Sequence, residues 1–160
     1  MILTQIENSR LTAILSPYME DIRACEMRKY IQHGAVSTFQ HCVNVARVSF
    51  WINRRLKCGS DERALAIGAF LHDFYLYDWH VKDVSHRLHG FSHALAAKNN
   101  AVKYFDIGDK EQKIIASHMW PLNITCVPRS REALIVCIAD KYCSLVESLA
   151  QRKRGRIICG

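Results

Sequence analysis

Apolar residues in this chain recur at steps of three and four, and this spacing restricts the fold more than any other feature. Within the segment 38–55, Phe39, Val43, Ala46 and Phe50 are separated alternately by four and three residues. Such spacing places side chains on one face of a helix. No segment shows a convincing alternation of period two, and the chain has only three prolines. The pattern predicts an all-α fold.

Capping residues and helix breakers divide the chain into predicted helices. Ser16 and Pro17 are expected to be the N-cap and first position of a helix that runs to about residue 31. Ser60 or Asp61 is expected to cap a later helix that carries a long apolar run. Further helices are predicted from about residue 37 to 58, 93 to 105, 110 to 120 and 130 to 151, with a polar stretch at about 75–91 and a loop at 121–128.

Length and composition fit one ordinary domain over residues 1–160. The chain is 49% hydrophobic and 23% charged, which is typical of a globular protein. No apolar run approaches the roughly 20 residues of a membrane span, and the N-terminal segment lacks a basic leader, so we expect a cytoplasmic protein without membrane contact. The seven cysteines contain no C-x-x-C pair. They are therefore expected to be free, buried thiols.

The net charge of +7 favours an anionic partner. Much of the excess lies in a basic C-terminal tail, residues 151–160. The remaining cations do not line one helix face beside base-reading side chains, which argues against a nucleic-acid-binding protein. The expected partner is a small phosphorylated molecule such as a nucleotide.

A histidine and an aspartate stand side by side at the end of a predicted apolar helix. Neighbouring side chains on a helix point about 100° apart, so His72 and Asp73 can both approach one ion. His41 lies early in the preceding long helix, and Asp140 interrupts an apolar stripe, where a carboxylate must be paired, hydrogen-bonded or bound to metal. Imidazole and carboxylate together suit iron, manganese, zinc, nickel or cobalt better than calcium. The four residues predict a divalent metal site.

The order H…HD…D, formed here by His41, His72–Asp73 and Asp140, resembles the HD superfamily of metal-dependent phosphohydrolases. The resemblance extends over roughly residues 35–148. It implies an HD-type helical bundle with one or two metal ions in its core, and an enzyme that hydrolyses a phosphomonoester, nucleotide or phosphodiester. The alternative is a non-catalytic HD-like module that binds a nucleotide or a partner protein. All four motif residues are present, which favours the enzyme.

Two further histidines match HD members that bind a second ion. The resemblance implies that His93 and His118 complete this second site and that Asp73 bridges the two ions, which makes Asp73 a catalytic residue. His89 competes with His93 as the ligand. His89 is alternatively a catalytic residue that protonates the leaving group.

One departure from the family concerns substrate contacts. Many members follow the HD pair with a small turn and a lysine, whereas this chain continues with aromatic residues. Lys141 is therefore predicted to be the catalytic cation that meets phosphate, with Lys82 and Arg87 as other candidates. Three aromatic side chains after the pair belong either to the core or to a wall that stacks on a base: Tyr75, Tyr77 and Trp79.

Overall fold

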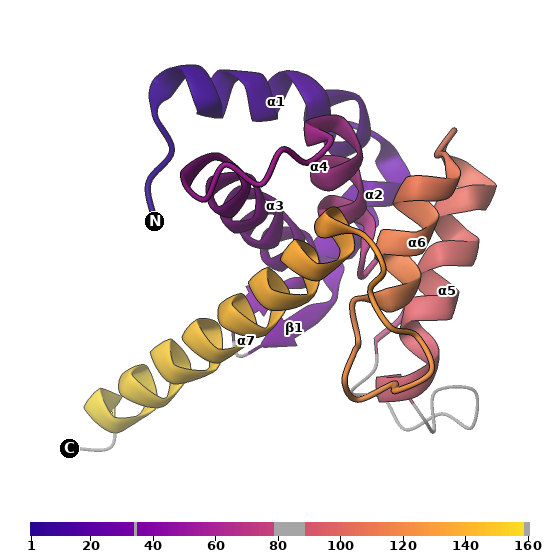
Figure 1. Cartoon of the computed structure of the whole chain (residues 1–160). Helices are drawn as coiled ribbons and strands as arrows, with labels where there is room; N and C mark the ends of the chain where they lie inside the picture. Colours follow the sequence, from indigo (N-terminus) through magenta and orange to yellow (C-terminus); the bar gives the residue numbers. More distant parts are fainter. Residues whose placement is uncertain (34, 79–88, 159–160) are drawn as a thin grey trace.

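The chain folds into helices that surround α3 and α4, with one small hairpin between α2 and α3 (Figure 1). A computed structural model describes residues 1–33, 35–78 and 89–158, and the side chains of residues 33, 89–91 and 152–158 lie outside that description. The helices are α1 (Gln5–Met19), α2 (Ile22–Glu26), α3 (Thr38–Arg55), α4 (Glu62–Leu71), α5 (His89–Tyr104), α6 (Asp109–Ser117) and α7 (Arg131–Ile158). A 3₁₀ turn, η1 (Met27–Lys29), precedes the antiparallel strands β1 (Ile31–His33) and β2 (Val36–Ser37). The all-α prediction is confirmed, and the hairpin is its one addition among the described residues.

Side-chain caps explain where two of the helices begin. The Asp61 carboxylate accepts hydrogen bonds of 3.1 Å from the backbone N–H groups of Arg63 and Ala64, so it is the cap of α4. Thr4 and Glu7 form a reciprocal capping box at the start of α1. The Glu7 N–H donates to the Thr4 hydroxyl, and the Thr4 N–H donates to the Glu7 carboxylate. Each cap satisfies backbone donors that have no partner within the helix.

The predicted helix start at Ser16–Pro17 is wrong. Pro17 lies inside α1, in its last turn, where a missing N–H removes one hydrogen bond from a helix that is about to end. Asp21 caps the next helix instead, since its carboxylate accepts from the N–H of Arg23 at 2.8 Å. Two further boundaries also differ: α5 begins at residue 89, ahead of the predicted start at about 93, and α7 continues to residue 158, beyond the predicted end at about 151.

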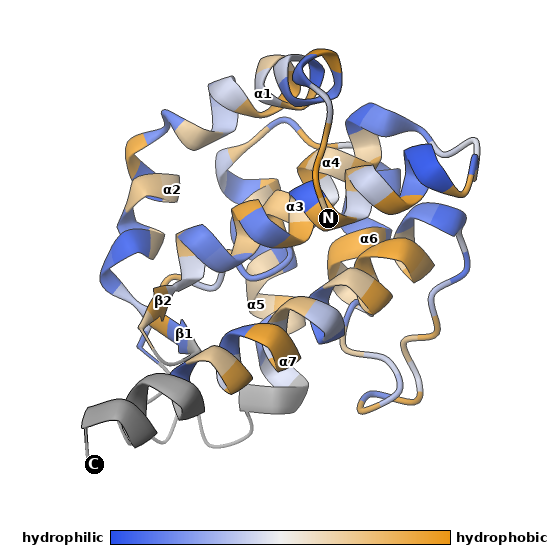
Figure 2. Cartoon of the chain, turned by 90° about the vertical axis from the view of Figure 1, so that its left-hand side faces the viewer, coloured by the Kyte–Doolittle hydropathy of each residue, from blue (hydrophilic) through white to orange (hydrophobic). Residues whose placement is uncertain are grey.

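The core forms where α3 and α4 meet the helices around them. All residues of α4 from Ala64 to Leu71 are buried, because α1, α3, α5, α6 and α7 pack around this helix. A Cβ atom at Gly68 would lie 2.7 Å from Cγ2 of Ile114, so the glycine permits the close approach of α4 and α6. Figure 2 shows hydrophilic and hydrophobic residues interspersed along α3, as expected for a helix with one buried face.

The long helix α7 crosses the molecule, and its C-terminal part extends beyond the other helices (Figure 1). α7 packs against α3, α4 and α6. Val136, Ala139 and Asp140 are among the residues that it buries there. Within the part of the chain that the structure describes, no helix combines the length and apolarity needed to cross a membrane.

Candidate metal centre

The six residues predicted to bind metal lie together in the interior. Each exposes between 0 and 8% of its surface. They form three overlapping groups, and within each group the potential ligand atoms lie within 4.8 Å of one another. The contributing elements are α3 for His41, the end of α4 for His72 and Asp73, α5 for His93, the end of α6 for His118, and α7 for Asp140.

Two of the histidines occupy equivalent positions at the ends of their helices. His72 is the C-cap of α4 and His118 is the C-cap of α6. The Nδ1 atom of His72 lies 2.7 Å from the carbonyl oxygen of Ala69, and that of His118 lies 2.8 Å from the carbonyl oxygen of Ile115. Because the last carbonyls of a helix lack partners within it and can only accept, both Nδ1 atoms carry a hydrogen. Both Nε2 atoms are therefore available as ligands.

His41 is held in the same way by a carboxylate. Its Nδ1 atom lies 2.8 Å from Oε2 of Glu147, and its Nε2 atom lies 3.1 Å from Oδ1 of Asp140. Nδ1 donates to Glu147, which directs Nε2 toward the other ligands. A hydrogen bond from Nδ1 to a carboxylate or carbonyl is the usual companion of metal binding through Nε2.

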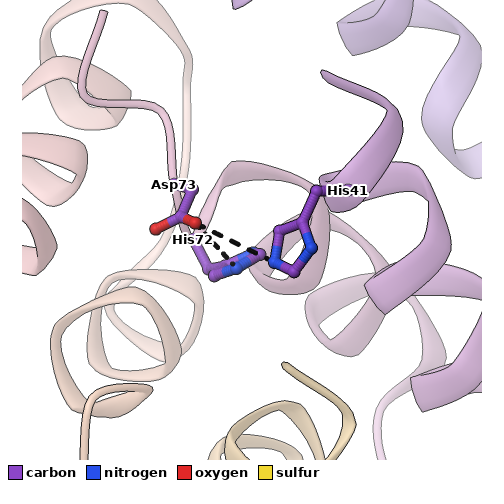
Figure 3. Close-up of side chains that lie close together, drawn as sticks. All are labelled: His41, His72 and Asp73. Atoms are coloured by element: carbon purple, nitrogen blue, oxygen red, sulfur yellow. Dashed lines mark ion pairs between the residues drawn. The ribbon is translucent and has the colours of Figure 1, made fainter. Parts of the chain in front are cut away.

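Asp73 lies between two sets of histidines. Its Oδ2 atom is 3.4 Å from Nε2 of His72 and 4.0 Å from Nε2 of His41. Dashed lines in Figure 3 mark these two pairs. Its Oδ1 atom is 3.4 Å from Nε2 of His93 and 3.5 Å from Nε2 of His118. The two oxygens thus face different imidazole pairs.

The spacing of the buried ligand atoms suits coordination of a divalent ion better than hydrogen bonding among themselves. Nε2 of His72 and Oδ1 of Asp73 are buried without a hydrogen-bond partner in the structure. Such groups are costly unless something satisfies them. Two ligand atoms that each lie about 2.1 Å from one ion are roughly 3.0–3.4 Å apart in octahedral or tetrahedral coordination. The separations of 3.0 to 3.5 Å between His93, His118 and Oδ1 of Asp73 match that spacing.

The charges of the centre are strongly coupled. Burial lowers the pKa of His41, but the hydrogen bonds to Asp140 and Glu147 more than offset this effect and raise it to about 10. Burial raises the pKa of Asp73, but the neighbouring histidines, His72 foremost, together outweigh it and hold that pKa well below its ordinary value. Asp140 behaves in the same way beside His41. The raised pKa of His41 means that it retains its proton when no ion is bound, and metal binding would displace that proton.

Among the residues that hydrogen-bond to the centre, Gln32 and Glu147 were missed by the sequence reasoning. Gln32 of β1 donates from Nε2 to Oδ2 of Asp73 at 2.6 Å, and its Oε1 accepts from the hydroxyl of Tyr75. Nothing in the sequence marks a glutamine in a three-residue strand. Glu147 was also missed, although it lies seven residues after Asp140. Two helical turns place both on one face of α7, so projecting that helix would have found it.

The structure describes only some of the side chains that were predicted to act on substrate. Lys141 is exposed, and its ammonium donates to the carbonyl oxygens of His118 at 3.0 Å and Cys137 at 3.4 Å. Tyr75 is buried, with its ring 4.8 Å from that of Tyr77. The remaining candidates lie outside the described side chains: Trp79, Lys82, Arg87 and His89.

The protein is thus a helical domain whose buried histidines and aspartates are suited to bind a divalent metal ion. The family model of the HD domain matches residues 38–145. The chain belongs to the HD domain family, a family of metal-dependent phosphohydrolases. The matched segment includes all six residues of the centre. No curated protein and no solved structure matches the chain significantly.

Proposed function

We propose that this protein is a metal-dependent phosphohydrolase that cleaves a phosphomonoester, nucleotide or phosphodiester. The observation that carries the proposal is the convergence of six buried ligand residues, among which Nε2 of His72 and Oδ1 of Asp73 have no hydrogen-bond partner. Carboxylate and imidazole groups of this kind suit iron, manganese, zinc, nickel or cobalt.

Two features favour two ions over one. The oxygens of Asp73 face separate pairs of histidines. In addition, the carboxylates of Asp73, Asp140 and Glu147 are all buried at this place. Three negative charges exceed what a single divalent ion offsets, and burying unbalanced charge is costly. A second ion beside His93 and His118 offsets the negative charge that remains.

Each part of the site has a separate task in this proposal. Bound ions supply an activated water and offset negative charge on the phosphoryl group. Asp73 connects the histidine pair His41 and His72 with the pair His93 and His118. Gln32 fixes the orientation of the Asp73 carboxylate. Lys141 meets the phosphate, and His89 protonates the leaving oxygen, as inferred from the sequence. The positive net charge of the chain attracts an anionic substrate.

The alternative is a non-catalytic HD-like module that binds a nucleotide or a protein. Such a module has no need to keep its ligand set complete, whereas all six ligand residues are present and buried here. The ligand set therefore favours the enzyme.

The test is to measure bound metal in the purified protein and to screen hydrolysis. Phosphomonoesters, nucleotides and cyclic dinucleotides are incubated with added manganese, iron, cobalt, nickel or zinc. We expect one to two equivalents of metal and turnover that Asp73→Asn abolishes, while the exposed Asp106→Asn retains it. Less than about one equivalent of metal with no hydrolysis under any condition would overturn the proposal. Nucleotide binding to the metal-loaded protein without turnover would support the module instead.

A further inference from the structure

Beside His41, on the side away from the other ligands, lies the buried carboxylate of Glu147. Its Oε2 atom lies 2.8 Å from Nδ1 of His41, and its Oε1 atom accepts a hydrogen bond of 2.8 Å from the side-chain amide of Asn44. Glu147 exposes 8% of its surface. We propose that Glu147 is a positioning residue that sets the tautomer of His41 for metal binding. This inference rests on the proposed metal-dependent function.

His41 needs such a partner because of its place in the chain. His72 and His118 end their helices and donate to carbonyls three residues earlier. His41 lies in the first turn of α3, where the carbonyl of Thr38 is taken by the helix's own hydrogen bonds. An acceptor for its Nδ1–H must therefore come from another element. Glu147 on α7 supplies it, so that Nε2, which faces Asp140 and Asp73, is the nitrogen left to bind metal.

The surroundings of Glu147 require a carboxylate rather than an amide. The amide of Gln40 donates to Oδ1 of Asn44 at 2.9 Å, which fixes Asn44 with its NH₂ group toward Glu147. Glu147 thus receives one hydrogen bond from Asn44 and one from His41, and it needs an acceptor atom for each. A glutamine has a single oxygen. Its NH₂ group would oppose Asn44, or it would donate to Nδ1 of His41 and move the imidazole hydrogen to Nε2.

A hydrogen on Nε2 blocks the atom that faces the other ligands, so this tautomer cannot bind metal through it. Loss of the carboxylate also makes His41 a weaker electron-pair donor. Mutation of such hydrogen-bond partners of metal ligands lowers metal affinity by about 10- to 100-fold in other metalloproteins. A role limited to joining α3 and α7 would instead change the unfolding free energy and leave the intrinsic metal affinity unaltered.

The experiment titrates the full-length metal-free protein with Zn²⁺ by calorimetry and measures urea unfolding in parallel. Glu147→Gln is compared with Glu132→Gln, a matched control on the same helix. Glu132 is also buried, exposing 7% of its surface, and it accepts a hydrogen bond of 2.8 Å from the Asp61 N–H, away from the centre. We expect Zn²⁺ affinity to fall about 10- to 100-fold in Glu147→Gln and to stay unchanged in Glu132→Gln.

A second variant tests the tautomer argument directly. Adding Asn44→Ala to Glu147→Gln removes the competing donor, so the glutamine oxygen can turn to His41 and Zn²⁺ affinity should partly recover. Glu147→Asp, which keeps the charge but shortens the reach to His41, should weaken binding as well and replaces Glu147→Gln if that variant does not fold.

The outcomes separate this inference from the proposed function. Wild-type protein that binds no metal overturns both. Wild-type protein that binds Zn²⁺ while Glu147→Gln binds it equally tightly overturns the role of Glu147 alone. Equal losses of Zn²⁺ affinity in Glu147→Gln and Glu132→Gln would assign the effect to α7 as a whole and would also reject the specific role of Glu147.

Discussion

Replacing Gly68 with alanine tests whether the close approach of α4 and α6 positions the metal centre. A Cβ atom at residue 68 would lie 2.7 Å from Cγ2, 2.9 Å from Cβ and 3.0 Å from Cδ1 of Ile114. Favourable carbon–carbon contacts begin near about 3.5 Å, so either Ile114 or the whole of α6 must shift by roughly 0.5–1 Å. Ile114 is fully buried, which leaves its side chain little room to turn away.

The expected loss of stability is modest because two effects oppose each other. Forcing a methyl group into a packed core costs about 1–3 kcal/mol. Alanine recovers about 1 kcal/mol through its higher helix propensity than glycine. The unfolding free energy of Gly68→Ala should therefore fall by about 1 kcal/mol, which corresponds to about 2–4 °C in a chain of this length.

The effect on metal binding should be larger than the effect on stability. α6 ends at His118, whose Nε2 atom lies 3.5 Å from Oδ1 of Asp73. A displacement of about 1 Å at a functional group can reduce function about 100-fold. Urea unfolding of the metal-free protein gives the first quantity, and calorimetric titration with Mn²⁺ or Zn²⁺ gives the second. We expect Gly68→Ala to bind metal with clearly lower affinity, or to bind one equivalent of metal less than the wild type.

Gly108→Ala serves as the control for this substitution. Gly108 precedes α6 with an ordinary φ of −80°, and a Cβ atom there meets only the end of the Glu111 side chain, at 3.1 Å. Because glycine is the better N-cap, stability should fall by about 0.5 kcal/mol while metal binding stays intact. The reasoning is refuted if Gly68→Ala is more stable than the wild type and binds metal with unchanged stoichiometry and affinity.

Two further predictions concern stability. Gln32→Leu removes one hydrogen bond from the carboxylate of Asp73 and one from the hydroxyl of Tyr75. The unfolding free energy measured in urea should therefore fall by about 1–3 kcal/mol, and a fall of less than about 0.5 kcal/mol would contradict this account. The hydrogen bond from Arg55 is the main reason that the pKa of Glu7 falls from 4.5 to about 2. Because the folded pKa is the lower one, this stabilisation is complete above about pH 4.5 and is lost as the pH falls toward 2. Thermal melts across that range should show a weaker acid dependence for Arg55→Gln than for the wild type, and equal slopes would reject the assignment.

The parts of the fold that the sequence predicts well are those with a local physical signal. The apolar spacing around Phe39 and Phe50 marks α3, and the cap at Asp61 marks α4, because each depends on neighbours a few residues away. The start of α1 was missed although its capping box, Thr4 with Glu7, is equally local. The serine–proline pair at residues 16–17 has the same appearance as a helix start, and only the packing of the chain decides between the two signals.

The candidate site likewise contains residues that the sequence predicts and residues that it does not. The four residues of the H…HD…D pattern were predicted from their positions on apolar helices and from the resemblance to the HD superfamily, and His93 and His118 from that resemblance alone. The residues that hold the ligands in place were not, because glutamine and glutamate are ordinary surface residues in a sequence. Gln32 reaches Asp73 across 41 positions of the chain, and Glu147 reaches His41 across 106. Contacts of that range depend on the tertiary fold.

The centre also explains how a chain can bury so many charges and still fold. Without an ion, a proton on His41 lies between the carboxylates of Asp140 and Glu147, and this is why the pKa of that histidine is raised to about 10. The proton offsets charge that would otherwise cost several kcal/mol in the interior. In the proposed function, a metal ion would displace the proton on Nε2, and Glu147 would retain the one on Nδ1. The hydrogen bonds that offset charge in the metal-free core are therefore the same ones that orient His41, and folding prepares this part of the site before any ion arrives.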